Sequence, residues 1–350
     1  MTEHTRDTAP LPDTGMGTRM DTTTGTALLD VRALSVSYHR PGRRAGAVHA
    51  VRGVDLTVRR GETVGLVGES GSGKSTIGSA VLGLVPAAAG RVAFDGADIT
   101  HGTRADRRLL ARRMQVVFQD PYGSMNPAHT VGDTLAEALR YNLGLPEDAV
   151  RERVMTALAD VGLPPGAAHR YPAAFSGGQR QRIAIARALV MEPEFVVCDE
   201  AVSALDLSVQ AQVLNLLARL KRSRGLSYLF ISHDLSVVRY FSDTIVVLYA
   251  GRVVERGPAA RVADDPAHPY TRALLAAAPV PDPVVQRRRQ EERRRTVAAA
   301  APGRTDGGCD FAARCPFAQD VCRTTRPELT DHAGVTVACH RYEDLKASAA

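Results

Sequence analysis

Residues Val64-Gly-Leu-Val-Gly-Glu-Ser-Gly-Ser-Gly-Lys-Ser-Thr-Ile77 join an apolar run to a helical pattern through a glycine-rich loop. Gly68–Ser75 fits the motif G-x-x-x-x-G-K-[ST], which is credible when a strand precedes it and a helix follows. Its glycines let backbone N–H groups turn inward around phosphates, and the helix dipole adds to the attraction. Lys74 supplies a point charge and Ser75 a hydroxyl for Mg²⁺. The stretch therefore predicts a phosphate-binding loop.

The composition is that of a folded globular protein. Of 350 residues, 44% are hydrophobic and 23% charged, which excludes a disordered or fibrous chain. The length allows one large core and a smaller appended unit. No uncharged apolar run approaches the roughly 18 residues that span a bilayer, and no signal peptide is evident, so we expect a cytoplasmic protein. The net charge of +6 leaves nucleic acid, nucleotide and anionic lipid open as partners.

Three segments differ in composition. Residues 1–27 are rich in threonine and poor in large apolar side chains, so we expect them to be disordered. Residues 28–257 alternate short apolar runs with helical stretches, which predicts an α/β domain with a parallel sheet covered on both faces. Residues 258–350 begin with a proline- and arginine-rich linker, around 279–295, and end in a cysteine-bearing unit.

Four apolar runs inside the second segment end at polar or glycine residues. Ligands of open α/β sheets bind beyond the carboxyl ends of the strands, so these endings are expected to converge on one site, although strands often end at polar loops for no functional reason. The runs are Val64–Val67, Met114–Phe118, Phe195–Cys198 and Tyr228–Ile231, followed by Gly68, Gln119, Asp199-Glu200 and Ser232-His233. Between them, residues 120–178 read as a helical insertion with helices over 134–141 and 148–161.

The pair Asp199-Glu200 is the natural complement of the phosphate loop. A buried strand delivers both carboxylates to its end, where Asp199 would hold Mg²⁺ through water and Glu200 would orient or deprotonate the attacking water. The preceding Cys198 is expected to pack as a small buried hydrophobe.

Phe175-Ser-Gly-Gly-Gln179 precedes a helical stretch over 180–191. Ser176 is a suitable N-cap, and the glycine amides could bind an anion. By itself the string also fits an ordinary helix start.

The order of these motifs resembles the nucleotide-binding subunits of ATP-binding-cassette transporters over roughly residues 28–257. The residues that carry the resemblance are Tyr38, the loop at Gly68, Gln119, Phe175–Gln179, Asp199-Glu200, Ser203–Asp206 and His233. It implies a P-loop NTPase core with a mainly parallel sheet, an antiparallel β subdomain, a helical subdomain at about 120–178 and a small C-terminal cysteine-bearing extension.

The resemblance also implies a role for each matching residue. Tyr38 would stack on adenine, unless it is an ordinary strand tyrosine. ATP would bind Gly68, Glu69, Ser70, Gly71, Ser72, Gly73, Lys74, Ser75 and Thr76. Ser75, Gln119 and Asp199 would serve Mg²⁺, with Gln119 also touching the attacking water. Glu200 and His233 would be catalytic, His233 through the γ-phosphate.

Other matching residues point to a second subunit. Ser176, Gly177, Gly178 and Gln179 would contact ATP held by the partner, and Asp206 would be a dimer contact. The chain departs from the family at Ala201, where proline usually follows the Asp-Glu pair. This change loosens a turn beside Glu200 and bears on the hydrolysis rate, whereas ATP binding is unaffected.

Three strings narrow the resemblance to the oligopeptide and dipeptide importer branch, and to its second, F-type ATPase. They are Val202–Gln212, Ser232–Val238 and His268-Pro-Tyr-Thr271. The branch implies a translocase that hydrolyses ATP on the cytoplasmic face of the cell membrane, as a peripheral subunit. Its partners would be a second ABC ATPase in a heterodimer, two transmembrane permeases and, indirectly, an extracytoplasmic solute-binding protein.

Two alternatives concern the cargo and the class. Relatives also carry nickel or other small solutes. A nucleic-acid-associated ABC ATPase would use the basic charge, but it would need long coiled-coil insertions, and no sustained heptad pattern occurs, so we expect no nucleic-acid partner.

Four of the five cysteines lie in the C-terminal region, at Cys309, Cys315, Cys322 and Cys339. Disulfides are disfavoured in a reducing cytoplasm, which leaves metal ligation or free thiols. No Cys-x-x-Cys pair is present, although four thiolates could still hold zinc. Because relatives with a similar tail carry a [4Fe-4S] cluster, the resemblance ranks the cluster above zinc.

Overall fold

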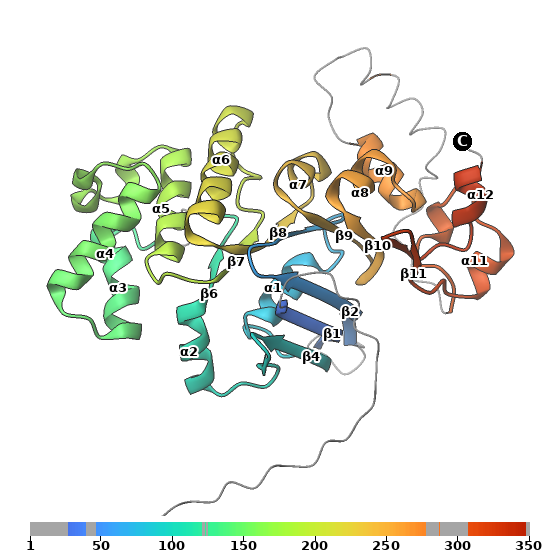
Figure 1. The fold of residues 1–350 in the computed structure, drawn as a ribbon, viewed down its shortest axis with the longest axis horizontal. Coiled ribbons are helices and arrows are strands. Elements are labelled where there is room, and N and C mark those ends of the chain that lie inside the picture. Colours follow the sequence, from blue (N-terminus) through green and yellow to red (C-terminus); the bar gives the residue numbers. More distant parts are fainter. Residues whose placement is uncertain are drawn as a thin grey trace, which may run out of the picture.

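Eight strands form the central sheet, in the order β11-β12-β10-β9-β3-β8-β7-β6 (Figure 1). The computed structural model describes residues 27–39, 47–120, 123, 125–277, 287 and 307–347. Strands β9, β3, β8, β7 and β6 are parallel, and β10, β12 and β11 complete the sheet antiparallel. In sheet order the strands span Thr330–His332, Val335–Val337, Arg252–Pro258, Thr244–Tyr249, Thr63–Val67, Ser227–Ser232, Phe195–Asp199 and Met114–Val117. The predicted α/β fold with a mainly parallel sheet is confirmed.

A second sheet of four antiparallel strands packs below the first, in the order β2-β1-β4-β5 (Figure 1). These strands span Ala47–Arg59, Ala27–His39, Ala89–Phe94 and Ala97–Asp98. One apolar cluster joins Val31 and Val58 of this sheet to Leu66 and Leu229 of the central sheet. Helix α1 (Lys74–Val81) contributes Ile77 to the same cluster, so the start of the phosphate loop's helix is clamped between the two sheets.

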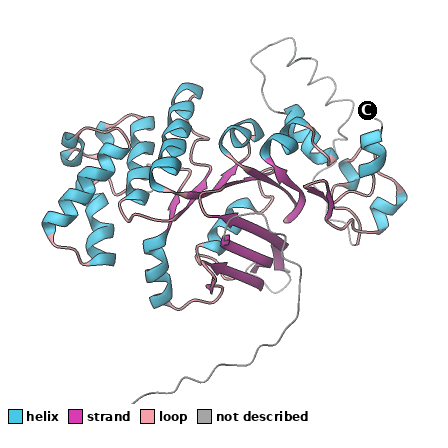
Figure 2. Cartoon of the chain, viewed as in Figure 1, coloured by secondary structure: helices cyan, strands magenta, loops and turns pink. Residues whose placement is uncertain are grey.

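Figure 2 shows one group of helices on the other face of the central sheet, a second group beyond its β6 end and a third beyond its β11 end. The helical insertion comprises α3 (Val131–Leu143), α4 (Glu147–Asp160), the 3₁₀ turns η1 (Pro165–His169) and η2 (Pro172–Ala174), and α5 (Gly177–Leu189). The remaining helices are α2 (Arg104–Arg113), α6 (Leu207–Arg224), α7 (Leu235–Phe241), α8 (Ala259–Asp264), α9 (Pro269–Ala277), α11 (Asp320–Thr324) and α12 (Tyr342–Ala347), with η3 at Ala312–Arg314. Among the described helices none combines the length and hydropathy that crossing a bilayer requires.

Helix α3 begins three residues before the predicted start at Thr134. The Thr130 hydroxyl accepts a hydrogen bond from the Asp133 N–H and caps the first turn, an N-cap signal that apolar periodicity alone does not show. The helix ends at Gly144, whose φ of 61° is left-handed.

The C-terminal region is not separated from the core at residue 257. Strand β10 crosses that boundary, and β12 pairs with it antiparallel, Glu255 opposite Val337, so the cysteine-bearing unit extends the central sheet. A boundary drawn where the local pattern changes cannot show such a pairing between distant segments. At the other end, β1 starts at Ala27, one residue inside the segment expected to be disordered. Residues 1–26 and the predicted linker, except residue 287, lie outside the described residues.

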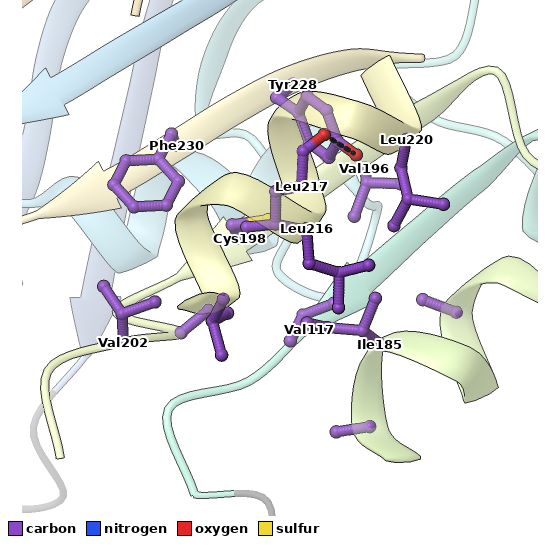
Figure 3. Close-up of a cluster of buried hydrophobic side chains, with 14 of the residues drawn as sticks. Val117, Ile185, Val196, Cys198, Val202, Leu216, Leu217, Leu220, Tyr228 and Phe230 are labelled. Carbon is purple, nitrogen blue, oxygen red and sulfur yellow. Dashed lines mark hydrogen bonds between the residues drawn. The ribbon is translucent and has the colours of Figure 1, made fainter. Parts of the chain in front are cut away.

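Cys198 packs in the core between the sheet and α6, as expected for a small hydrophobe. Figure 3 shows it among Val202, Leu216, Tyr228 and Phe230, and its side chain is fully buried. Burial raises the pKa of its thiol far above the ordinary value, so the group stays protonated and unreactive. The hydroxyl of Tyr228 donates to the Leu217 carbonyl, 3.4 Å away, which gives this buried phenol a partner.

Replacing Phe230 with alanine is expected to destabilise the protein by about 3–5 kcal/mol, because it empties a fully buried site in contact with the ring of Phe241. Urea unfolding followed by circular dichroism measures the change. Leu207→Ala, at a side chain 83% exposed, is the control and is expected to change stability by less than about 0.5 kcal/mol. Equal effects of the two variants would contradict this description of the core.

Candidate functional site

The predicted endings of β3 and β7 meet at one edge of the central sheet. Ser75 at the start of α1 donates its hydroxyl hydrogen bond to Asp199 Oδ1 at the end of β7, 2.9 Å away. Strand β8 lies between β3 and β7 and carries His233 just beyond its end. The phosphate loop and both predicted carboxylates therefore share one site.

Close backbone contacts give the phosphate loop its shape. A Cβ atom on Gly73 would lie 2.4 Å from the Ala50 carbonyl oxygen, and Gly73 has a φ of +104°, so only glycine fits. At Gly68 a Cβ would lie 2.2 Å from the Leu248 carbonyl oxygen. The Lys74 ammonium donates to the carbonyls of Gly68, at 2.8 Å, and of Glu69, at 3.0 Å, so it lies within the loop.

Burial and charge oppose each other at this edge. Burial lowers the pKa of Lys74, and the carboxylates of Glu200, Asp199 and Glu69 oppose that shift. Burial also raises the pKa of Asp199; the Ser75 hydroxyl lowers it, and the Glu200 charge raises it further. The two neighbouring carboxylates of Asp199 and Glu200 are suited to bind a cation, and the buried ammonium of Lys74 is suited to bind a polyanion. The site therefore fits a complex of a metal ion with a polyanion.

The residues present fit Mg²⁺ and a triphosphate. The Ser72 hydroxyl is buried within the loop and has no hydrogen-bond partner in the described structure, so it is free to donate to a phosphate oxygen. Ser75 and Asp199 offer the oxygen ligands that Mg²⁺ prefers, and this ion needs few protein ligands because it keeps several waters.

Glu200 is held in a left-handed backbone conformation with a φ of 48°. Its N–H donates to the Ile231 carbonyl at 3.0 Å, and its own carbonyl accepts from the N–H and hydroxyl of Ser203, at 3.1 and 2.9 Å. Oε2 of Glu200 lies 3.5 Å from Nδ1 of His233, whose side chain is 57% exposed. The turn is thus held by three hydrogen bonds although Ala201 stands where the family usually has proline.

Gln119 and Tyr38 lie at the margins of the site. Nε2 of Gln119 donates to the Ser203 hydroxyl at 3.4 Å, which brings the end of β6 to the turn that carries Glu200. Tyr38 is 43% exposed, and its hydroxyl donates to Thr76 Oγ1 at 3.4 Å, so its ring stands beside the start of α1.

The predicted Ser-Gly-Gly-Gln segment lies elsewhere. Ser176 and Gln179 form a capping box at the start of α5, and a Cβ on Gly178 would lie 2.4 Å from Val209 Cγ1 of α6. In Figure 1, strands β6 and β7 lie between α5 and α1. Asp206 caps α6, its Oδ1 accepting from the N–H groups of Ser208 and Val209. The chain therefore does not bring this segment to its own phosphate loop.

The four C-terminal cysteines line one small pocket of about 20 Å³. Burial raises the pKa of Cys309 and of Cys315 to about 11, so both free thiols are protonated at neutral pH. Among the described residues, no group of three or more His, Cys, Asp or Glu side chains is arranged to hold a metal ion. The pocket has room for about one water molecule, so the four thiols as placed form no coordination shell, and a cluster would require the walls to open.

Two residues that contact the phosphate loop were not predicted from the sequence. The Tyr270 hydroxyl accepts from the Glu69 N–H at 2.8 Å, and Arg314 forms an ion pair with the Glu69 carboxylate at 2.8 Å. Both lie about 200 residues or more from the loop along the chain, so no local pattern could have marked them.

Two family profiles match the chain. Residues 51–203 match the family described as ABC transporter, and residues 254–322 match the one described as oligopeptide/dipeptide transporter, C-terminal region. The first spans the phosphate loop and the Asp-Glu pair, and the second reaches from β10 through three of the four cysteines.

Relatives and solved structures agree with these matches. A putative peptide import ATP-binding protein of Brucella ovis is 48% identical over 91% of this chain and 99% of its own length. The oligopeptide transport ATP-binding protein OppF of Salmonella typhimurium is 47% identical over 85% of this chain and 89% of its own. The structure of cbiO1 from Clostridium perfringens, part of an ABC transporter complex, superimposes with a TM-score of 0.61 at 30% identity, over 68% of this chain and 91% of that one. With the phosphate loop and the Asp-Glu pair at one sheet edge, these likenesses place the chain in the ABC transporter family, as one of its ATP-hydrolysing, ATP-binding proteins.

Proposed function

We propose that this chain hydrolyses ATP to drive the import of oligopeptides or dipeptides through partner permeases. The observation that carries the proposal is the convergence of Lys74, Ser75, Asp199 and Glu200 at one edge of the sheet, in a chain whose C-terminal region matches that of peptide transporters. The similar proteins of Brucella ovis and Salmonella typhimurium are named for peptide import and oligopeptide transport.

The phosphates bind the loop from Gly68 to Thr76, with the adenine against Tyr38. Ser75, Asp199 and Gln119 would hold Mg²⁺, directly or through water, and the ion would offset the charge of the phosphates. Glu200 accepts the proton of the attacking water, and its left-handed turn, hydrogen-bonded to Ser203, keeps its carboxylate in place. His233 lies 3.5 Å from that carboxylate. In this position it would contact the γ-phosphate of bound ATP.

The site is completed by a second ABC ATPase. Ser176, Gly177, Gly178 and Gln179 lie away from this chain's own phosphate loop, so they serve the ATP of a partner while the partner's equivalent segment serves this one. Asp206, which caps α6 next to Gly178, borders the contact. The complex is a heterodimer on the cytoplasmic face of the membrane, beneath two permeases that a solute-binding protein supplies.

We further propose that Cys309, Cys315, Cys322 and Cys339 ligate a [4Fe-4S] cluster, with zinc as the alternative. The support is the gathering of four thiols around one pocket, whose walls would have to move apart to admit the cluster. Four thiolates are a common ligand set for either group.

Replacing Lys74 with alanine is expected to weaken Mg·ATP binding roughly 10- to 150-fold, because charged hydrogen bonds contribute about 1.5–3 kcal/mol. Isothermal titration of the full chain measures the affinity. Lys346→Ala, at a lysine paired with Asp265 near the C-terminus, is the matched control and is expected to bind as the wild type does. Unchanged binding by Lys74→Ala would refute the assignment of the phosphate loop.

Replacing Glu200 with glutamine is expected to leave ATP binding intact, to lower turnover about 10²- to 10⁴-fold and to trap closed dimers. Phosphate release and size-exclusion chromatography with ATP measure the two effects, in the complex purified with its partner subunits. Glu192→Gln is the control, since Glu192 also has a left-handed φ, of 55°, but lies outside the site. Equal turnover by wild type and Glu200→Gln would exclude this carboxylate as the base.

Anaerobically purified protein is expected to contain iron and sulfide and to absorb visible light, and Cys322→Ser is expected to lose both. Elemental analysis distinguishes iron from zinc. Cys198→Ala, in the core away from the pocket, is the control and should retain the metal. The absence of both metals from the wild type would leave the cysteines as thiols and end this part of the proposal.

A further inference from the structure

The cysteine-bearing C-terminal unit, described over residues 307–347, contacts the phosphate loop at Glu69. The two terminal nitrogens of Arg314 donate to the two carboxylate oxygens of Glu69, each at 2.8 Å. The pairing is bidentate, the geometry in which an arginine fixes both the position and the orientation of a carboxylate. The Arg314 side chain is only 12% exposed, so water screens this pair less than a surface ion pair.

Every polar group of Glu69 is engaged. Its N–H donates to the Tyr270 hydroxyl at 2.8 Å, and its carbonyl accepts from the Lys74 ammonium at 3.0 Å. A continuous set of contacts therefore runs from Arg314 through Glu69 to the lysine that faces the phosphates.

Arg314 is itself rigidly mounted. Phe311, three residues earlier, is 1% exposed and packs edge-on against Tyr249, with ring centroids 5.3 Å apart. Asp310 accepts from Arg52 of β2 at 3.1 Å. Because Asp310 and Phe311 are both anchored on the core, the backbone that carries Arg314 is held beside the phosphate loop.

The charges give the pairing a consequence for nucleotide binding. Unpaired, the Glu69 carboxylate would be a negative charge within the loop that must receive a triphosphate. It would also be free to compete for Lys74, since its charge already acts on that ammonium. By pairing with this carboxylate, Arg314 neutralises its charge. The carboxylate then neither repels the triphosphate nor competes for Lys74.

We infer that Arg314 is a positioning residue for ATP, which acts through Glu69 to hold the phosphate loop in its binding shape and to cancel the charge beside it. The inference rests on the ATP site proposed above. A merely structural ion pair between the core and the C-terminal unit would stabilise the protein equally with and without nucleotide. Its loss would lower the unfolding temperature and leave the Mg·ATP affinity of the folded protein unchanged.

A double-mutant cycle on the full chain separates these roles, with Mg·ATP affinity measured by isothermal titration. Arg314→Met is expected to weaken binding roughly 5- to 10-fold, within the usual range of coupling between sites. In a Glu69→Gln background the same change is expected to have little further effect, because the charge that Arg314 cancels is already gone. Arg314→Lys, which keeps the charge but loses the fork, is expected to be intermediate.

Arg323→Met removes an exposed arginine from the same unit and is expected to bind as the wild type does. Thermal unfolding without nucleotide reports loss of fold, and if Arg314→Met does not fold, Arg314→Lys and Arg314→Gln carry the cycle. Wild-type affinity in the folded Arg314 variants, or equal losses in the wild-type and Glu69→Gln backgrounds, would overturn the inference. A wild type that fails to bind Mg·ATP would instead refute the proposed site.

Discussion

Close approach of three backbone segments around the phosphate loop is the constraint on which the rest of the structure depends. The loop, β2 and the turn between β9 and β10 meet where Gly73 and Gly251 each leave room for the Ala50 carbonyl oxygen. The Gly251 N–H also donates to the Ser72 carbonyl at 2.9 Å, so the turn and the loop share a backbone hydrogen bond. Because no side chain fits between them, the loop cannot move without disturbing both sheets.

The same turn connects the site to the C-terminal unit. Strand β10 leaves it at Arg252, and β12 adds to the sheet beside β10. Asp310 lies 3.7 Å from the Arg252 guanidinium and 3.1 Å from that of Arg52. These ion pairs link the cysteine-bearing unit to β10 of the central sheet and to β2 of the second sheet. Cys309 and Cys315 bound the segment that carries Asp310 and Arg314. The segment between these two cysteines therefore contacts the phosphate loop through Arg314.

Much of the site could be predicted from local sequence, since each motif encodes its own geometry. The phosphate loop follows from glycines at fixed spacing between a strand and a helix, and the capping box at Ser176 and Gln179 from the start of an amphipathic helix. The convergence of Asp199 on Ser75 followed from a general rule of parallel sheets, and the 2.9 Å hydrogen bond agrees with it. Burial of Cys198 followed from its place in an apolar strand.

Other features depend on contacts between segments far apart in the chain. Local periodicity predicts whether a segment forms a helix or a strand, and where many of these elements end. Both depend on backbone dihedral preferences and on which face of the element is apolar. Local periodicity does not predict the contact between Glu69 and Arg314, which lie 245 positions apart. Nor does it predict the pairing of β12 with β10 or the left-handed turn at Glu200. Tertiary packing decided these three features. Each becomes favourable only after folding of the sheets has brought its interacting segments together.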